Sequence, residues 1–206
     1  PNATHTGIRF LDALFTSTSA VCVTGLIVVD TGSHFTLFGQ CIILGLFQIG
    51  GLGIMTFASY FSYFFRGGTT YENQLMLSDM TSSSKLGEVF NTLKNIILIT
   101  ISIETIGALV IFSNLSAAEI PSFFDRAFFS FFHSVSAFCN AGFSTLPNSL
   151  YAVFFKFKYG IHSMAMVLFI FGGLGFPIVF NLFKYLRYLV TKRLIPFLLN
   201  ESNETV

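Results

Sequence analysis

Apolar residues concentrate in three runs that are each long enough to form a membrane-spanning helix. The runs cover residues 37–65, 93–112 and 159–190. A helix needs about 20 mostly apolar residues to cross the roughly 30 Å hydrocarbon core of a bilayer. At about 1.5 Å per residue the first and third runs exceed that thickness, so these helices must tilt or extend into water. The pattern predicts an all-α membrane protein.

Two shorter apolar stretches, residues 10–21 and 125–138, are only about half a span long. Their length fits buried core helices, interfacial helices or re-entrant half-helices. Each precedes a glycine-containing segment, "SAVCVTGLIVVDTG" in the first case and "SAFCNAGFSTLPN" in the second. Aligning Gly25 with Gly142 gives six identities in the eleven positions that end at these glycines. The half-helix, its loop and a long helix therefore form a unit that occurs twice.

An internal repeat in an apolar chain is typical of pseudosymmetric transporters and channels. A re-entrant half-helix followed by an extended loop ending in glycine is the form of a selectivity filter, in which backbone carbonyl oxygens replace the hydration shell of an ion. We predict that such filter loops bind the ion through two segments, Val23, Thr24 and Gly25 in the first and Asn140, Ala141 and Gly142 in the second.

No Asp, Glu, Lys or Arg lies within residues 22–26 or 139–143, which favours a monovalent cation. The alternative is that each loop is a glycine turn between two helices in a non-transporting membrane scaffold.

The composition supports the membrane interpretation and excludes other classes. Of 206 residues, 53% are hydrophobic and only 10% charged, whereas soluble proteins have about 25% charged residues. A net charge of +1 argues against nucleic acid as a partner, and the apolar composition favours membrane lipid. The four histidines have no catalytic spacing, so we do not expect an enzyme. The three cysteines lack metal-ligand spacing, and we expect Cys22, Cys41 and Cys139 to be small buried residues.

Four segments carry a family resemblance: "TSTSAVCVTGLIVVDTG", "QIGGLGIMTF", "IETIGAL" and "SVSAFCNAGFS". They resemble the membrane subunit of the Trk/Ktr/HKT superfamily of potassium and sodium transporters over about residues 10–183. The resemblance implies four helix–pore-loop–helix repeats in one chain, with Gly25 and Gly142 as filter glycines. This sequence holds two such loops, so we interpret it as a fragment that lacks the first outer helix and the last two repeats.

The same resemblance implies potassium, or sodium, as the transported ion and the cell membrane as the location of a multi-pass protein. The partners it implies are the remaining repeats, a second copy in a homodimer and a cytoplasmic nucleotide-binding regulatory subunit. Glycine in both loops favours potassium by analogy. The choice between potassium and sodium, and between channel-like and coupled transport, stays open.

The domain organisation follows from the repeat. Residues 1–65 hold one half-helix, filter loop and inner helix, and residues 66–92 form a cytoplasmic linker. Residues 93–190 hold the next outer helix, half-helix, loop and inner helix, and residues 191–206 form a tail. With the loops opening outward, seven Lys and Arg residues fall inside and four outside, in agreement with the positive-inside rule.

Three polar or glycine features remain open to two interpretations. Glu104 lies in the middle of a spanning run, where an acid costs about 2.5–3.5 kcal/mol; we favour a hydrogen-bonding fastener over an ion or proton site. Asp30 could attract cations at the outer mouth or cap a turn. The repeated "GGLG" of residues 50–53 and 172–175 could allow close helix packing or leave room for a pore, and we favour packing.

Overall fold

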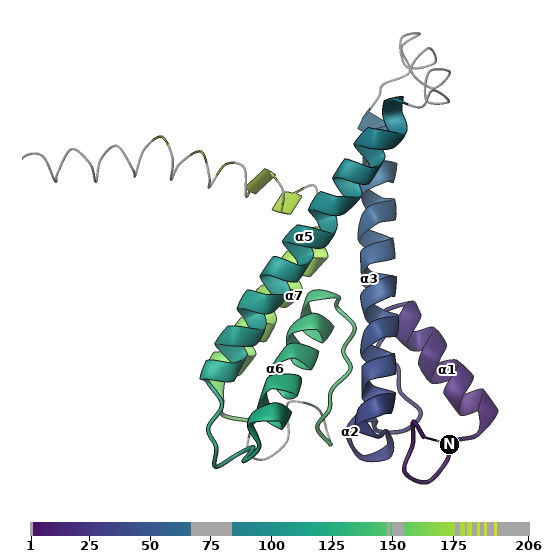
Figure 1. Ribbon diagram of the computed structural model, residues 1–206, viewed down its shortest axis with the longest axis vertical. Helices are drawn as coiled ribbons and strands as arrows, with labels where there is room; N and C mark the ends of the chain where they lie inside the picture. Colours follow the sequence, from purple (N-terminus) through teal and green to yellow (C-terminus); the bar gives the residue numbers. More distant parts are fainter. Residues whose placement is uncertain are drawn as a thin grey trace, which may run out of the picture.

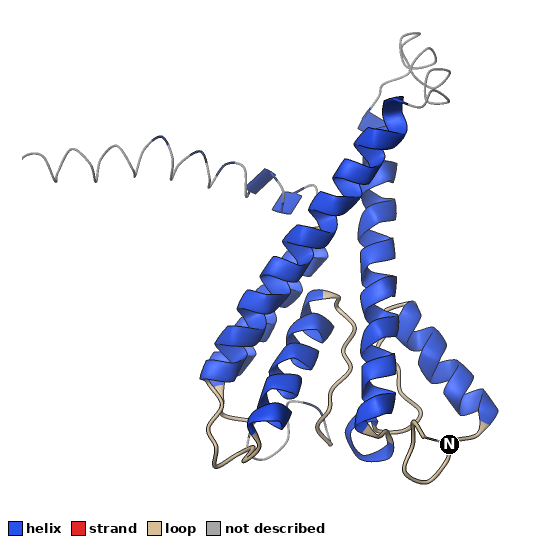
Figure 2. Ribbon diagram, in the orientation of Figure 1, coloured by secondary structure: helices blue, strands red, loops and turns tan. Residues whose placement is uncertain are grey.

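The computed structural model describes residues 2–66, 84–147, 149 and 155–175, with seven further positions up to residue 192. The described part is helical and contains no strand (Figure 2). Its helices are α1 (Phe10–Val21), α2 (Thr31–His34), α3 (Leu37–Arg66), α5 (Ser84–Ser113), α6 (Phe123–Phe138) and α7 (Tyr159–Leu174).

The two short helices, α1 and α6, agree with the predicted half-helices. Helix α1 has the predicted bounds, and α6 begins two residues before the predicted start because Ser122 caps it, its Oγ accepting from Asp125 N at 3.4 Å. Both enter from the lower end of the molecule in Figure 1, and the segment that follows each one returns to that end. Each short helix and the segment after it therefore begin and end on the same side of the molecule.

The long helices surround these half-helices. Helix α1 packs on α3, whereas α6 lies between α3, α5 and α7 (Figure 1). Helix α5 begins at Ser84, inside the segment that the sequence assigns to the linker; residues 67–83 of that segment lie outside the described residues. Within the described residues, one helix segment, Lys94–Ser113, is long and apolar enough to cross a membrane.

The third apolar run differs from the prediction of one continuous helix over residues 159–190. Helix α7 ends at Leu174, and Gly175 follows with φ 75°. A residue in this left-handed region ends an α-helix, and glycine adopts the conformation without a Cβ penalty. Helix α3 has the same glycine pattern but continues past Gly53 to Arg66.

Two apolar cores hold the structure together. The first lies between the repeats, where the ring of Phe47 from α3 packs edge-on against Phe132 of α6 at 5.5 Å and stacks on Phe143 of the second loop at 6.0 Å. The second lies inside the second repeat and joins α5, α6 and α7 through Ile111, Phe129 and Leu168. The first core fixes the position of one loop relative to the other repeat.

Candidate ion-binding loops

The half-helices α1 and α6 end in the same hydrogen-bonded turn. After α1, Val23 N donates to Ala20 O at 3.1 Å and Thr24 N donates to Ser19 O at 2.9 Å. The aligned bonds after α6 measure 3.0 and 2.8 Å, from Asn140 to Ala137 and from Ala141 to Ser136. These two bonds define a Schellman motif, which requires a left-handed residue just after the helix. The repeat in sequence is therefore also a repeat in backbone geometry.

The predicted extended conformation is wrong at Val23 and Asn140. Their φ angles are 54° and 59°, because each occupies the left-handed position of the motif. The two predicted filter glycines, Gly25 and Gly142, are also left-handed, with φ 76° and 71°. A left-handed β-branched residue such as Val23 is a genuine outlier, and strain of this kind concentrates at functional sites.

The two loops meet directly. A Cβ added to Gly25 would lie 2.5 Å from the carbonyl oxygen of Ala141, and one added to Gly142 would lie 3.8 Å from Cα of Gly25. Farther along, Gly32 lies so close to the carbonyl of Thr145 that a Cβ would collide there too. The structure thus brings the two predicted filter segments together at residues 25, 141 and 142.

The first glycine of each "GGLG" receives the end of a half-helix. Gly50 of α3 lies against the carbonyl oxygen of Val21, and Gly172 of α7 lies against the aligned carbonyl oxygen of Phe138. A Cβ at either glycine would collide with that oxygen. Around Gly53 and Gly173 there is open space. Close packing therefore accounts for Gly50 and Gly172.

Side chains of α6 hold the second loop from behind. Ser136 Oγ donates to Phe143 O at 2.7 Å, and His133 Nε2 lies 2.9 Å from Ser144 Oγ. His133 Nδ1 is 2.9 Å from Phe129 O, which can only accept, so Nδ1 carries the proton and Nε2 accepts from Ser144. The sequence did not lead us to predict that His133 and Ser136 hold the second loop. The available signal is that these two residues are three positions apart and therefore share one face of the helix.

In the first repeat, Ser19 aligns with Ser136. Its hydroxyl is buried, and within the described residues it has no hydrogen-bond partner. The two loops are therefore supported differently although their backbones match.

Glu104 is buried, with 2% of its surface exposed. Its Oε2 accepts from Gln48 Nε2 at 3.0 Å, and its backbone carbonyl accepts from Ser134 Oγ at 2.6 Å. Cys139 Sγ lies 3.7 Å from Gln48 Oε1, which adds the start of the second loop to the same group. Glu104 thus connects α5 to α3 and α6, and this geometry favours the fastening interpretation.

Two other sequence expectations have clear outcomes. Asp30 caps α2, accepting from Ser33 N at 2.9 Å and from Ser33 Oγ at 3.0 Å. Cys139 is buried as expected, but the expectation is wrong for Cys22 and Cys41, which are exposed. Gly51 and Gln48 of the first repeat cover Cys139.

The chain belongs to the TrkH family of cation transport proteins, whose family model matches residues 2–202. It is 39% identical over 190 residues to Ktr system potassium uptake protein B of Bacillus subtilis, a match that covers 91% of this chain and 41% of the relative. It is 37% identical over 183 residues to the protein of that name from Vibrio alginolyticus, covering 88% of this chain and 39% of the relative.

A third relative is the potassium/sodium uptake protein NtpJ of Enterococcus hirae, 36% identical over 181 residues, which cover 87% of this chain and 39% of the relative. The chain therefore spans about two fifths of the length of these relatives.

Proposed function

We propose that this chain supplies two of the loops of a potassium-uptake pore. The observation that carries the proposal is that two half-helices with matched left-handed ends bring Gly25 and Ala141 into direct contact. The names of the relatives support potassium as the ion, and the Enterococcus relative keeps sodium as an alternative.

The ion-binding groups in this proposal are the backbone carbonyls of residues 23–25 and 140–142. In each segment a residue without positive φ lies between two left-handed ones. Carbonyl oxygens of a selectivity filter replace the hydration shell of the ion, and we propose this role for the carbonyls of these segments. The C-terminal ends of α1 and α6 add partial negative charge where these segments begin.

The proposed location is the cell membrane, with several passes of the chain. Apolar side chains on the outer surface of α5 are exposed, among them Leu98 at 58% and Leu109 at 64%, and they fit contact with lipid. Arg9 precedes α1 and Lys158 precedes α7 at the end to which the loops return, whereas Arg66 ends α3 at the opposite end (Figure 1). We assign the loop end to the outside and the Arg66 end to the cytoplasm, because seven Lys and Arg residues of the sequence then fall inside and four outside.

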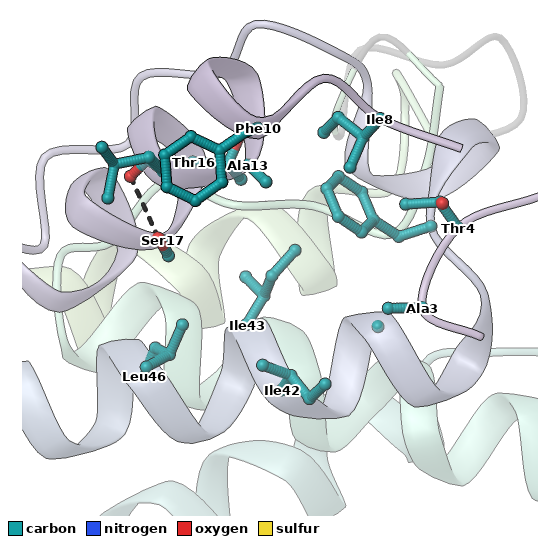
Figure 3. A pocket seen from close by; sticks show the side chains of 13 residues that line it. Ala3, Thr4, Ile8, Phe10, Ala13, Thr16, Ser17, Ile42, Ile43 and Leu46 are labelled. Carbon is teal, nitrogen blue, oxygen red and sulfur yellow. Dashed lines mark hydrogen bonds between the residues drawn. The ribbon is translucent and has the colours of Figure 1, made fainter. Parts of the chain in front are cut away.

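We propose that further repeats of the same polypeptide complete the pore. A groove in the first repeat supports this part of the proposal. The groove, about 350 Å³ in volume, lies between α1 and α3 and is lined in part by Ser17 and Leu46 (Figure 3). These residues align with Ser134 and Leu168, and Gly107 of α5 lies so close to both that a Cβ there would approach them to 2.5 and 2.8 Å. A helix equivalent to α5 therefore fits the groove, and we assign it to the same polypeptide.

The proposed organisation keeps residues 1–65 and 93–190 as two successive repeats joined by a cytoplasmic segment. A homodimer and a nucleotide-binding regulatory subunit at the cytoplasmic surface complete the proposal. The names of the Bacillus and Vibrio relatives, which assign them to a Ktr system, support an assembly of several components.

The test is cation uptake by the complete polypeptide in cells that lack their own potassium uptake. We expect saturable potassium uptake that exceeds sodium uptake. Uptake dominated by sodium would select the alternative ion. Normal membrane insertion without any cation flux would contradict transport and favour the scaffold.

A further inference from the structure

The side chain of Asn140 reaches the inner helix of its own repeat. In the amide orientation that satisfies both of its polar groups, Nδ2 donates to Phe169 O at 3.2 Å and Oδ1 accepts from Gly173 N at 3.2 Å. These two backbone groups are four residues apart, so they are the acceptor and donor of one α-helical hydrogen bond. Asn140 therefore engages the last turn of α7 at both groups.

This contact lies immediately before the point where α7 ends. Leu174 is the last residue of the helix, and Gly175 is left-handed. Gly172 packs on the carbonyl of Phe138, and a Cβ there would lie 3.0 Å from the amide atom of Asn140 that is the oxygen in this orientation. The start of the second loop and the end of α7 thus form one closely packed joint.

The first repeat has no equivalent amide. Val23 occupies the aligned left-handed position, and its isopropyl group can neither donate nor accept a hydrogen bond. Helix α3 also continues through the aligned Gly53. The amide contact therefore occurs in the repeat whose inner helix is interrupted.

We propose that the Asn140 side chain is a positioning residue that fixes the second filter loop to α7 just before its end, and that the ion preference depends on this attachment. The inference rests on the proposed function. Its physical basis is that Ala141 directly follows Asn140 in the chain, and the carbonyl oxygen of Ala141 lies against Gly25 of the first loop. Without the amide contact, residue 140 can rotate and displace the carbonyl that meets the first loop.

The test compares Asn140→Gly with Ser149→Gly in the complete polypeptide. Ser149 is exposed and also left-handed, with φ 57°, and it is not among the proposed ion-binding residues. Glycine keeps the left-handed conformation at either position, and only Asn140→Gly removes the two hydrogen bonds to α7. We expect Asn140→Gly to raise the half-saturating potassium concentration and lower the potassium/sodium uptake ratio by about three- to tenfold, the range implied by the loss of one or two hydrogen bonds. Ser149→Gly should stay within about twofold of the unmodified protein, a change smaller than one net hydrogen bond.

A second variant, Asn140→Asp, retains the shape and the acceptor for Gly173 but, when ionised, loses the donor to Phe169. It should shift the ion preference in the same direction. The inference is overturned if both Asn140 variants behave like the unmodified protein at equal membrane abundance, or if Ser149→Gly produces the same shift. It is also overturned if neither Asn140 variant reaches the membrane, which would make the residue a folding determinant.

If the unmodified protein does not transport potassium, the proposed function fails instead. The attachment is then tested alone by hydrogen exchange at residues 169–174. Faster exchange of the Gly173 amide in Asn140→Gly supports the attachment, and unchanged exchange overturns it.

Discussion

Gln48 of α3 donates from Nε2 to Oε2 of Glu104 in α5 at 3.0 Å, and this bond connects the two repeats in the protein interior. The acid therefore has a partner from the neighbouring repeat, with Cys139 close to the same pair. A buried acid that is held by neighbouring side chains has a structural reason to be in the middle of an apolar helix.

Glu104→Gln should retain much of the transport, because the amide oxygen can still accept from Gln48. Glu104→Leu leaves the half-buried Gln48 amide without that acceptor, which should lower the free energy of unfolding by up to about 1–3 kcal/mol. Potassium uptake and thermal unfolding in detergent, measured for both variants, check this. Loss of flux in Glu104→Gln at normal stability and membrane abundance would indicate a role for the charge.

Gly25→Ser and Gly142→Ser should each change the potassium/sodium preference. A left-handed residue with a Cβ costs about 1–2 kcal/mol, and at Gly25 the new atom would also meet Ala141 O. We therefore expect the larger effect from Gly25→Ser. Uptake of both ions, with membrane protein quantified, checks the prediction, and unaltered preference and affinity in both variants would refute the filter assignment.

Gly50→Ala should prevent α1 from docking on α3, because the methyl group would occupy the place of Val21 O. Gly172→Ala should do the same for α6 on α7. The matched control is Gly53→Ala, where nothing lies within 4 Å and the higher helix propensity of alanine should stabilise by up to about 1 kcal/mol. Folded yield and melting temperature separate the three variants; equal yields for Gly50→Ala and Gly53→Ala would contradict the packing role.

An ion pair between Glu119 and Lys158 should make stability depend on pH. The hydrogen bond from Lys158 holds the pKa of Glu119 below its ordinary value of 4.5. A lowered pKa in the folded state means that the stabilisation is complete well above pH 4.5 and disappears as the pH falls through the lowered value. At pH 7 the free energy of unfolding of the unmodified protein should exceed that of Glu119→Gln by up to about 1 kcal/mol, because such surface ion pairs contribute little.

Melting curves of the two proteins between pH 7 and pH 3 measure this difference, which should shrink as the pH falls. A constant difference would mean that the ion pair does not contribute.

Local patterns in the sequence predicted the half-helices and the alignment of Gly25 with Gly142, because helix length and glycine position depend on nearby residues. The left-handed backbone conformation of Val23 was not predicted, because a β-branched residue rarely adopts it and only the observed turn requires it. The end of α7 had a signal, Pro177, which disfavours helical geometry in the residue before it.

Contacts between distant segments could not be predicted in this way. Cys22 and Cys139 align within matching stretches, yet one is exposed and the other buried, because only Cys139 lies beneath Gly51. The pairing of His133 with Ser144 and the contact from Asn140 to α7 likewise depend on how the chain folds back.

Helix α1 has 12 residues and is therefore about 18 Å long, a little more than half of the roughly 30 Å hydrocarbon core. In the proposed membrane placement, a cation at its inner end has crossed about half of the transmembrane voltage. One elementary charge changes energy by about 2.3 kcal/mol per 100 mV over the full drop, so half the drop gives about 1.2 kcal/mol. Potassium affinity at this depth should then differ by about sevenfold between an unenergised membrane and one held at 100 mV.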